Sequence, residues 1–404
     1  AAGIALLSPE GQFLSANPAF EEMIGATEAE LIGTPIAAIT FARAPCAASS
    51  GVKDSRMSAA SHPAVTVLVP CRNEERFIGA CLDSILKNDY PKERLEILVI
   101  DGMSQDETRS IVSRYVTQYP SIRLVDNIQL ITPCAFNVGI AESRGDIIMI
   151  MGAHAEYSST YISRLVDWLT RSGADNVGGV CMTLPANDSP VARAIARGLS
   201  HPFGVGTSYF RIGTSTPRWV DTVFGGCYRK DVFARIGLFD EQLIRNQDDE
   251  FNHRLIARGG RILLVPDVVS YYYPRSSLVQ LWRMFYQYGY FKPLVALKLG
   301  RIGTARQVVP MVCLGLLVGL SFASIGSHAS RFMLVLLVAL YLSADFAVSF
   351  AVGLSSGLRC VGWLMLVFPT LHVSYGMGYV RGIFDFLIRR KRPDIAVNTI
   401  PLSR

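Results

Sequence analysis

Two stretches decide the fold of this chain: VTVLVPCRNEE at residues 65–75 and EILVIDGMSQDET at residues 96–108. Each begins with a short run of Val, Ile and Leu and continues into polar residues, which is typical of a buried strand followed by a turn. Two further apolar runs, IRLVD (122–126) and DIIMIM (146–151), follow the same plan. Between the four runs we expect helices, near residues 74–87, 105–119 and 134–143.

This regular alternation predicts an α/β fold with a mostly parallel sheet, buried on both faces by helices. Ligands of such sheets bind beyond the carboxyl ends of the strands, so we expect chemistry directly after residues 70 and 101. Neither turn contains a G-x-G-x-x-G motif, and a dinucleotide-binding Rossmann site therefore has little support. Ser104 and Glu107 are also compatible with a plain helix cap.

The composition indicates that part of the chain lies in a bilayer. Half of the 404 residues are hydrophobic and 18% are charged, whereas soluble domains carry roughly 25% charged residues. The formal net charge of +6 is too small to indicate nucleic-acid binding, and we find no nucleic-acid motif. Anionic lipid or an anionic substrate is the partner that this charge favours.

Three apolar runs, at residues 308–325, 332–354 and 361–380, are long enough to span a membrane as helices. Basic residues flank the first run and follow the last, and the positive-inside rule places both flanks in the cytoplasm. Because three crossings would separate the flanks, either the rule fails at the tail or one run does not cross. We expect this to be the third, as a broken or re-entrant segment, since it contains Pro369 and several small or polar residues.

The segment before these runs, residues 278–299, mixes Trp, Tyr and Phe with Arg and Lys. This mixture predicts a helix that lies along the membrane surface. The alternative is an aromatic helix of the protein core.

From residue 64 to 275 the sequence resembles the inverting family 2 glycosyltransferases of the GT-A, or nucleotide-diphospho-sugar transferase, fold. Four ordered blocks carry the resemblance: VTVLVPCRNEE (65–75), VIDGMSQDET (99–108), FGGCYRKDVFARIGLFDEQL (224–243) and NQDDEFNHRLIARGG (246–260). The resemblance implies that Asp101 holds the uracil ring of a UDP-sugar. It also implies a nucleotide-sugar pocket formed with Pro70, Asn73, Glu74 and Asp106.

The last block places Asp248 at the position of the family's catalytic base, which takes the proton from an acceptor hydroxyl. If Asp249 and Glu250 lie close to it, their charges raise its pKa and improve its basicity. The alternative interpretation is an acidic surface run at the start of a helix.

The sequence departs from the family where most members carry Asp-x-Asp. Here the chain reads Gly152-Ala153-His154, so the first carboxylate is missing. The resemblance implies a divalent cation, Mg²⁺ or Mn²⁺, at the leaving diphosphate. His154 occupies the metal position and can supply a neutral imidazole, with Glu156 as a helper. A histidine held there only by structural hydrogen bonds is the alternative.

Several residues are expected to contact the diphosphate or the acceptor, and anchors at the membrane surface are the alternative for the basic ones. They are Asp249, Arg275, Gln280 and Arg283. Within the family, GAHAEY (152–157), RNQDDEFNHRL (245–255) and YYYPRSSL (271–278) are most similar to membrane-attached exopolysaccharide enzymes of the succinoglycan type.

The first 40 residues resemble the opening half of a PAS sensor domain, through Asn17-Pro18-Ala19-Phe20 and Glu30-Leu31-Ile32-Gly33. The predicted domains are a partial PAS-like segment (1–45), a linker (46–63), a GT-A catalytic domain (64–275), an amphipathic interfacial helix region (276–306), transmembrane helices (307–388) and a basic tail (389–404).

The resemblance and the membrane runs together predict an inverting glycosyltransferase of the bacterial inner membrane, with its catalytic domain facing the cytoplasm. We expect it to move glucose from UDP-glucose to a polyprenyl-diphosphate-linked oligosaccharide in exopolysaccharide synthesis, in contact with membrane lipid and with other proteins of that synthesis. One alternative is a non-catalytic sensor or scaffold that binds nucleotide sugar. The other is a transferase that uses a polyprenyl phosphate acceptor directly.

Overall fold

The computed structural model describes residues 5–7, 13–16 and 62–391. Contacts divide the chain into two units, Ala1–Ser61 and His62–Arg404. In the first unit, β1 (Ala5–Leu7) and β2 (Phe13–Ala16) pair antiparallel. The residues that carry the PAS resemblance, 17–33, lie outside the described ones, so that resemblance stays a prediction.

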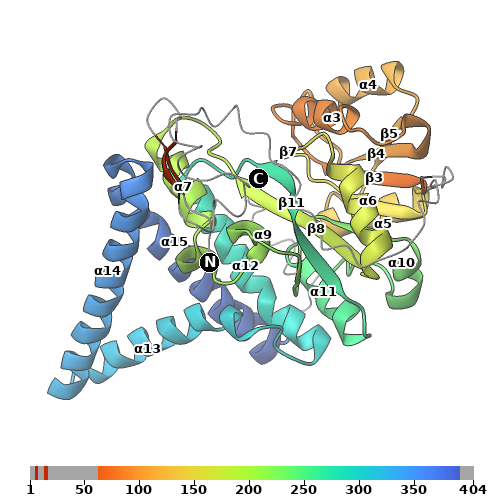
Figure 1. Ribbon diagram of the computed structural model, residues 1–404. Helices are drawn as coiled ribbons and strands as arrows, with labels where there is room; N and C mark the ends of the chain where they lie inside the picture. Colours follow the sequence, from red (N-terminus) through yellow and green to blue (C-terminus); the bar gives the residue numbers. More distant parts are fainter. Residues whose placement is uncertain (1–4, 8–12, 17–61, 392–404) are drawn as a thin grey trace, which may run out of the picture. The chain divides into compact units, whose positions relative to one another are not determined.

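The second unit is built on one mixed sheet in the order β5-β4-β3-β6-β10-β8-β11-β7, with the short β9 on β11 (Figure 1). Its strands are β3 (Val65–Cys71), β4 (Leu95–Asp101), β5 (Ile122–Asp126), β6 (Ile147–Ile150), β7 (Ala155–Tyr157), β8 (Asn176–Thr183), β9 (Arg218–Trp219), β10 (Gly226–Arg229) and β11 (Ile262–Tyr272). Strands β3, β4, β5 and β6 are parallel, as the four apolar runs predicted. The sheet is not parallel throughout, because β10 runs antiparallel between β6 and β8.

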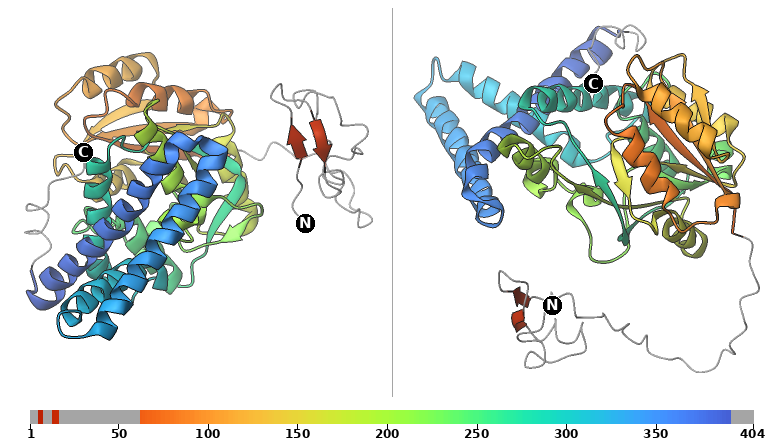
Figure 2. Two further views of the ribbon diagram at one scale, coloured as in Figure 1. Left: turned by 90° about the vertical axis from the view of Figure 1, so that its left-hand side faces the viewer. Right: turned by 90° about the horizontal axis from the view of Figure 1, so that it is seen from above.

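Helices cover both faces of this sheet (Figure 2). Along β3, Val65, Val67 and Val69 face one buried cluster and Leu68 faces the other. The first cluster includes α3 (Ile78–Leu86), α4 (Thr108–Gln118) and α6 (Tyr161–Ser172). The second includes α5 (Thr132–Glu142), α10 (Asp231–Ile236) and α11 (Gln247–Ala257). The predicted helices between the first four strands are therefore confirmed as α3, α4 and α5.

A helical module follows the sheet. It contains α12 (Leu278–Leu299), α13 (Val309–Ala323), α14 (His328–Ser356) and α15 (Val361–Gly382), and α15 continues into a π-helical segment, η5 (Ile383–Ile388). Short helices α7 (Pro190–Leu199), α8 (Pro202–Val205) and α9 (Tyr209–Ile212) connect β8 to β9. Single 3-10 turns lie at Lys92–Arg94 (η2), Ala305–Gln307 (η3) and Leu358–Cys360 (η4).

Helix α12 has the predicted bounds, and a large part of it is buried. Ten of its 22 residues are buried, including Tyr290, Phe291 and Lys292, so one side of the helix packs against the protein. It packs against α15, where a Cβ atom at Gly378 would collide with the carbonyl of Tyr286. Of the aromatic residues that suggested an interface, Tyr290 and Phe291 are buried, whereas Trp282 is exposed.

The third apolar run also differs from its prediction. Helix α15 is continuous through Pro369 rather than broken, although part of it is buried against protein as expected. The run that falls short is the first: 15 residues of α13 extend over about 22 Å, whereas the hydrocarbon core is about 30 Å thick. By length and composition, two helices in the described residues can cross a membrane, His328–Leu354 and Leu358–Ile388.

Candidate active site

A cavity of about 240 Å³ opens beyond the carboxyl ends of β3 and β6 and reaches the start of α11. Residues from α12 and from the segment after β11 complete its wall, so the sheet and the helical module both contribute to it. Its charged or imidazole-bearing side chains are Arg72, Glu74, His154, Arg245, Asp248 and Arg275. The cavity thus combines three guanidinium groups with two carboxylates.

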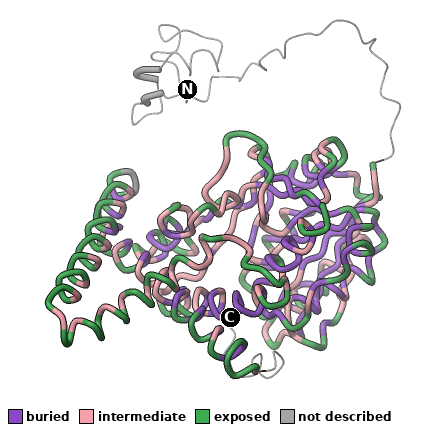
Figure 3. The backbone as a smooth tube through the Cα atoms, turned by 90° about the horizontal axis from the view of Figure 1, so that it is seen from below, coloured by how far each residue is buried: buried purple, intermediate pink, exposed green. Residues whose placement is uncertain are grey.

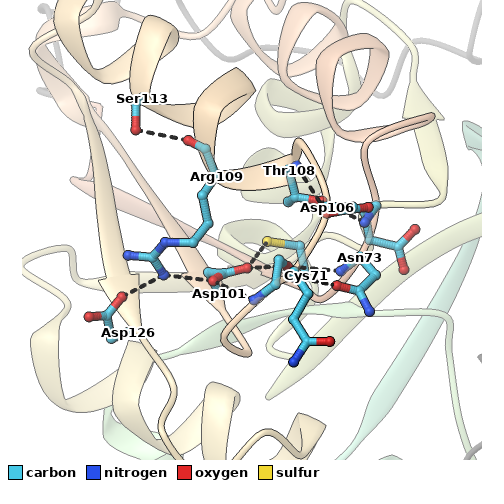
Figure 4. Close-up of polar contacts among 11 residues, drawn as sticks. Cys71, Asn73, Asp101, Asp106, Thr108, Arg109, Ser113 and Asp126 are labelled. Carbon is cyan, nitrogen blue, oxygen red and sulfur yellow. Dashed lines mark hydrogen bonds and ion pairs between the residues drawn. The ribbon is translucent and has the colours of Figure 1, made fainter.

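The turns after β3 and β4 are bonded to each other (Figure 4). The backbone N–H of Asn73 donates to Ser104 Oγ over 2.8 Å, and Asn73 Oδ1 accepts from the backbone N–H of Gln105 over 2.9 Å. Asp106 accepts from the Glu75 N–H over 3.2 Å. Asn73 has a φ of 54°, in the left-handed region that Asn tolerates better than most residues. Asn73 and Asp106 therefore shape the turns and are not among the residues that line the cavity.

Asp101 is fully buried beneath these turns, with no exposed surface. Its Oδ2 atom accepts from Arg109 Nη1 over 2.7 Å and from the Ser104 N–H over 3.0 Å. Arg109 also binds Asp126 over 2.8 Å (Figure 4). The resemblance implied direct contact with a uracil ring, but this carboxylate does not line the cavity and is used within the protein. Its position supports an organising role for the turns.

His154 lines the cavity beside Glu74, and its Nε2 atom lies 2.7 Å from Glu74 Oε1. Glu74 is 7% exposed, so this contact satisfies a carboxylate that is nearly removed from water. Among the residues that the structure describes, no group of three or more His, Cys, Asp or Glu is placed to hold a metal ion. The side chains present therefore do not fit a metal held by the protein alone, and we assign no chemical step to one.

Asp248 lies in the first turn of α11 and its side chain is exposed to the cavity. A solvent molecule can reach it there, yet protein surrounds it on most sides. Desolvation by the surrounding protein, followed by the charge of Asp249, raises the pKa of Asp248 above its ordinary value. An accessible carboxylate with a raised pKa is suited to accept a proton.

Asp249 has the opposite environment, since it is 9% exposed and its Oδ2 atom lies 2.7 Å from Lys292 Nζ. Burial alone would raise the pKa of Asp249, but the Lys292 ammonium and then His253 bring it below its ordinary value. Asp249 therefore stays charged beside the candidate base. Its charge raises the pKa of Asp248, which is the effect that the sequence predicted for Asp249.

Glu250 was also expected to raise the pKa of Asp248, but it is not among the groups that do so. Its two oxygens accept from Arg254 Nε over 2.8 Å and from Arg254 Nη2 over 2.9 Å. Arg254 in turn donates to the carbonyl of Leu238 over 2.7 Å. Because successive helical residues point about 100° apart, Glu250 fixes the loop after α10 while Asp248 faces the cavity.

Of the expected acceptor residues, Arg275 lines the cavity and the others do not. Gln280 belongs to the N-terminal cap of α12, where its N–H donates to Ser277 Oγ over 3.3 Å. Arg283 is exposed on α12. Asp249 is held by Lys292, as described above. The structure therefore brings Pro70, Glu74, His154, Asp248 and Arg275 together among the predicted residues.

Sequence reasoning missed Arg72, Arg245 and Tyr288, which also line the cavity. The sequence positions of two of them could have indicated a place in the cavity. Arg72 directly follows strand β3, and Arg245 stands three residues before the predicted base. Nothing in the sequence indicated that Tyr288 lines the cavity, since its helix was expected to lie along a membrane surface.

The mixed sheet with helices on both faces, and the cavity at its strand ends, are the architecture of a GT-A-like fold. The Glycosyl transferase family 2 model matches residues 66–236. A curated relative from Methanococcus voltae, named dolichyl N-acetyl-alpha-D-glucosaminyl phosphate 3-beta-D-2,3-diacetamido-2,3-dideoxy-beta-D-glucuronosyltransferase, is 31% identical over 58% of this chain and 74% of its own length. The chain belongs to glycosyltransferase family 2 and is an enzyme of that class.

Two further likenesses cover more of the chain. The succinoglycan biosynthesis protein ExoA of Rhizobium meliloti is 28% identical over 79% of this chain and 95% of its own length. The solved mannosyltransferase PcManGT from Pyrobaculum calidifontis, in complex with GDP-Man and Mn²⁺, is 21% identical and has a TM-score of 0.51 over 81% of this chain and 88% of its own. The latter likeness concerns the fold, which extends through the sheet and into the helical module.

Proposed function

We propose that this chain is a membrane-bound inverting glycosyltransferase that transfers a hexose, glucose from UDP-glucose, to a polyprenyl-diphosphate-linked oligosaccharide in exopolysaccharide synthesis. The observation that carries the proposal is the position of Asp248, an accessible carboxylate of raised pKa in a cavity that also contains three arginines. The cavity therefore has a base for the acceptor and positive charge for a leaving diphosphate.

The proposed step is a single displacement at the anomeric carbon of the donor. Asp248 takes the proton from an acceptor hydroxyl while that oxygen forms a bond to the anomeric carbon. On the opposite side, the bond from the anomeric carbon to the diphosphate breaks, and the electron pair leaves with the diphosphate. Arg72, Arg245 and Arg275 line the cavity and can offset the charge that develops there.

The names of two relatives support the acceptor class. One is named for a dolichyl-phosphate-linked sugar, and the other, which this chain matches over 95% of its length, is named for succinoglycan biosynthesis. Both names are compatible with a growing glycan on a polyprenyl lipid. The choice of glucose and of UDP rests on the resemblance described under the sequence.

Membrane attachment is supported by α14 and α15, which are long and apolar enough to cross. Helices α13 and α14 are largely exposed (Figure 3), with apolar side chains such as Phe322, Phe332 and Leu340 at the surface. If only α14 and α15 cross, the basic residues before α13 and those after α15 lie on the same side. The positive-inside rule then places the catalytic unit in the cytoplasm of a bacterium.

Release of UDP by the detergent-purified full-length chain tests the proposal. The assay uses a panel of UDP- and GDP-sugars, native lipid extract, and conditions with and without Mn²⁺. Asp248→Asn is compared with Asp231→Asn, a first-turn carboxylate of α10 whose side chain is 65% exposed. We expect release that needs lipid, prefers UDP-glucose, and disappears in Asp248→Asn alone.

Each other outcome revises the proposal in a defined way. Unchanged turnover in Asp248→Asn overturns the assignment of the base. Donor binding without release in any condition indicates the sensor or scaffold alternative. Analysis of the lipid product separates a polyprenyl-diphosphate-linked glycan from a sugar placed directly on polyprenyl phosphate.

A further inference from the structure

The residues that flank Asp248 are bonded to one helix outside the catalytic sheet. Asn246 Nδ2 donates to the carbonyl of Tyr288 over 2.9 Å, and Arg245 Nε donates to Gln287 Oε1 over 3.1 Å. On the other side of Asp248, Asp249 Oδ2 lies 2.7 Å from Lys292 Nζ. Helix α12 thus contacts α11 on both sides of the candidate base.

These contacts are buried. Asn246 is 7% exposed and Gln287 is 2% exposed, and the side chains of Lys292 and Asp249 are 10% and 12% exposed. A charge pair at this depth costs much more to break from one side than an exposed pair, because the remaining charge is left without a partner. The Lys292 pair therefore holds α11 at one distance from α12.

The start of α11 depends on such support. Asn246 adopts a φ of 62°, and its side chain makes no cap bond within α11. Its amide is used instead in the bond to α12 described above. The turn that aims Asp248 into the cavity is consequently defined by α12 as well as by its own sequence.

Helix α12 is itself held in place by α15. A Cβ atom at Gly289 would collide with the carbonyl of Tyr375, and one at Gly382 with the carbonyl of Tyr290, so the two helices touch along their backbones. Figure 1 shows α12 between the catalytic sheet and the last helices. Asp249 also accepts a hydrogen bond from Gln307 Nε2, in the segment before α13, over 3.3 Å.

We propose that α12 sets the position of the catalytic base, with Lys292 as the positioning residue that acts through Asp249. This inference rests on the proposed function, in which Asp248 is the base. It assigns to the helical module a part in catalysis besides attachment to the membrane, because the base is aimed correctly only while α12 and α11 are joined.

The test compares Lys292→Met, Lys292→Arg and Lys298→Met in the full-length chain. Lys298 is the matched control, since it lies on the same helix and its Nζ atom is 2.6 Å from Asp240, which is outside α11. Two quantities are measured for each variant: kcat and KM for UDP release, and the hydrogen exchange of peptides covering residues 245–257.

For Lys292→Met we expect kcat to fall about 10²-fold with the KM for the donor unchanged, and exchange to rise in residues 245–257 but not in β3 to β6. Lys292→Arg should recover part of kcat, and Lys298→Met should match the wild type. The proposal is overturned if Lys292→Met keeps kcat within about twofold of the wild type, or loses kcat without a change of exchange in α11.

Failure of the proposed function gives a different result. In that case the wild type releases no UDP with any donor, and the exchange measurement alone decides the inference. Faster exchange at the start of α11 in Lys292→Met, absent in Lys298→Met, supports anchoring by α12. Equal hydrogen exchange in the wild type, Lys292→Met and Lys298→Met contradicts anchoring by α12.

Discussion

The Nε2 atom of His154 lies 2.7 Å from the Oε1 atom of Glu74, so the histidine at the expected metal position is bonded to a carboxylate predicted for the nucleotide-sugar pocket. A metal ion that used His154 would have to replace this contact, and no third His, Cys, Asp or Glu in the described part of the chain completes the site. We therefore expect the protein without nucleotide to bind Mn²⁺ weakly. A nucleoside diphosphate can supply further oxygen ligands.

Electron paramagnetic resonance of Mn²⁺ checks this expectation, with titrations in the absence and presence of UDP. The signal of free Mn²⁺ should decrease at lower metal concentration only when UDP is present. Tight binding without nucleotide, lost in His154→Gln, would show that the protein alone makes a metal site.

The acid limb of the pH profile should reflect Asp248. The base works when it is deprotonated, so turnover is present above its pKa and is lost as the pH falls through that pKa. Because burial and the Asp249 charge raise the pKa of Asp248, we expect the limb of kcat/KM above the ordinary Asp value of about 3.9.

Asp249→Asn should move this limb to lower pH. The substitution removes a negative charge that raises the pKa of Asp248, while the Lys292 ammonium that lowers this pKa stays nearby. The pKa of Asp248 should therefore fall. The measurement is kcat/KM from pH 4 to 8 for wild type, Asp249→Asn and, as a control, Asp231→Asn. A limb that stays in place in Asp249→Asn would mean that another group is titrating.

Arg275 should contribute to donor turnover through its charge in the cavity. Arg275→Gln is expected to lower kcat/KM by about 10²-fold, the usual cost of losing one donor to a developing negative charge. Arg283→Gln is the matched control, because Arg283 is exposed on α12 and does not line the cavity. Equal kcat/KM values for the two variants would contradict a role in diphosphate binding.

Asp101 should affect stability more than Asp126, although both bind Arg109. Asp101 has no exposed surface, whereas the Asp126 side chain is 53% exposed. We expect Asp101→Asn to lower the free energy of unfolding by about 2 kcal/mol, as for other buried charged hydrogen bonds. Asp126→Asn should cost less than about 1 kcal/mol. Chemical denaturation in detergent measures both, and equal losses would contradict the difference in burial.

The sequence determined the elements in which apolar pattern and turn chemistry agree. The runs that became β3, β4, β5 and β6 consist largely of Val, Ile and Leu, and their burial follows from local composition. The position of Asp248 came from the resemblance to family 2 glycosyltransferases, and this residue lies in the first turn of α11 at the cavity. The polar residues of the first two turns were correctly placed together, since parallel neighbours end at the same edge of a sheet.

The tertiary structure decided what depends on partners distant in the sequence. Strand β10 joins β6 to β8 in the opposite direction, which no pattern within its four residues specifies. The three acidic residues at 248–250 look alike in sequence, yet one faces the cavity, one binds Lys292 and one binds Arg254. Helix α12 has the aromatic and basic composition of a membrane-surface helix, yet one side of it is buried and it contacts α11 and α15. In each case a partner some 40 residues or more away, or the rotation of a helix, selects one environment from several that the same local sequence permits.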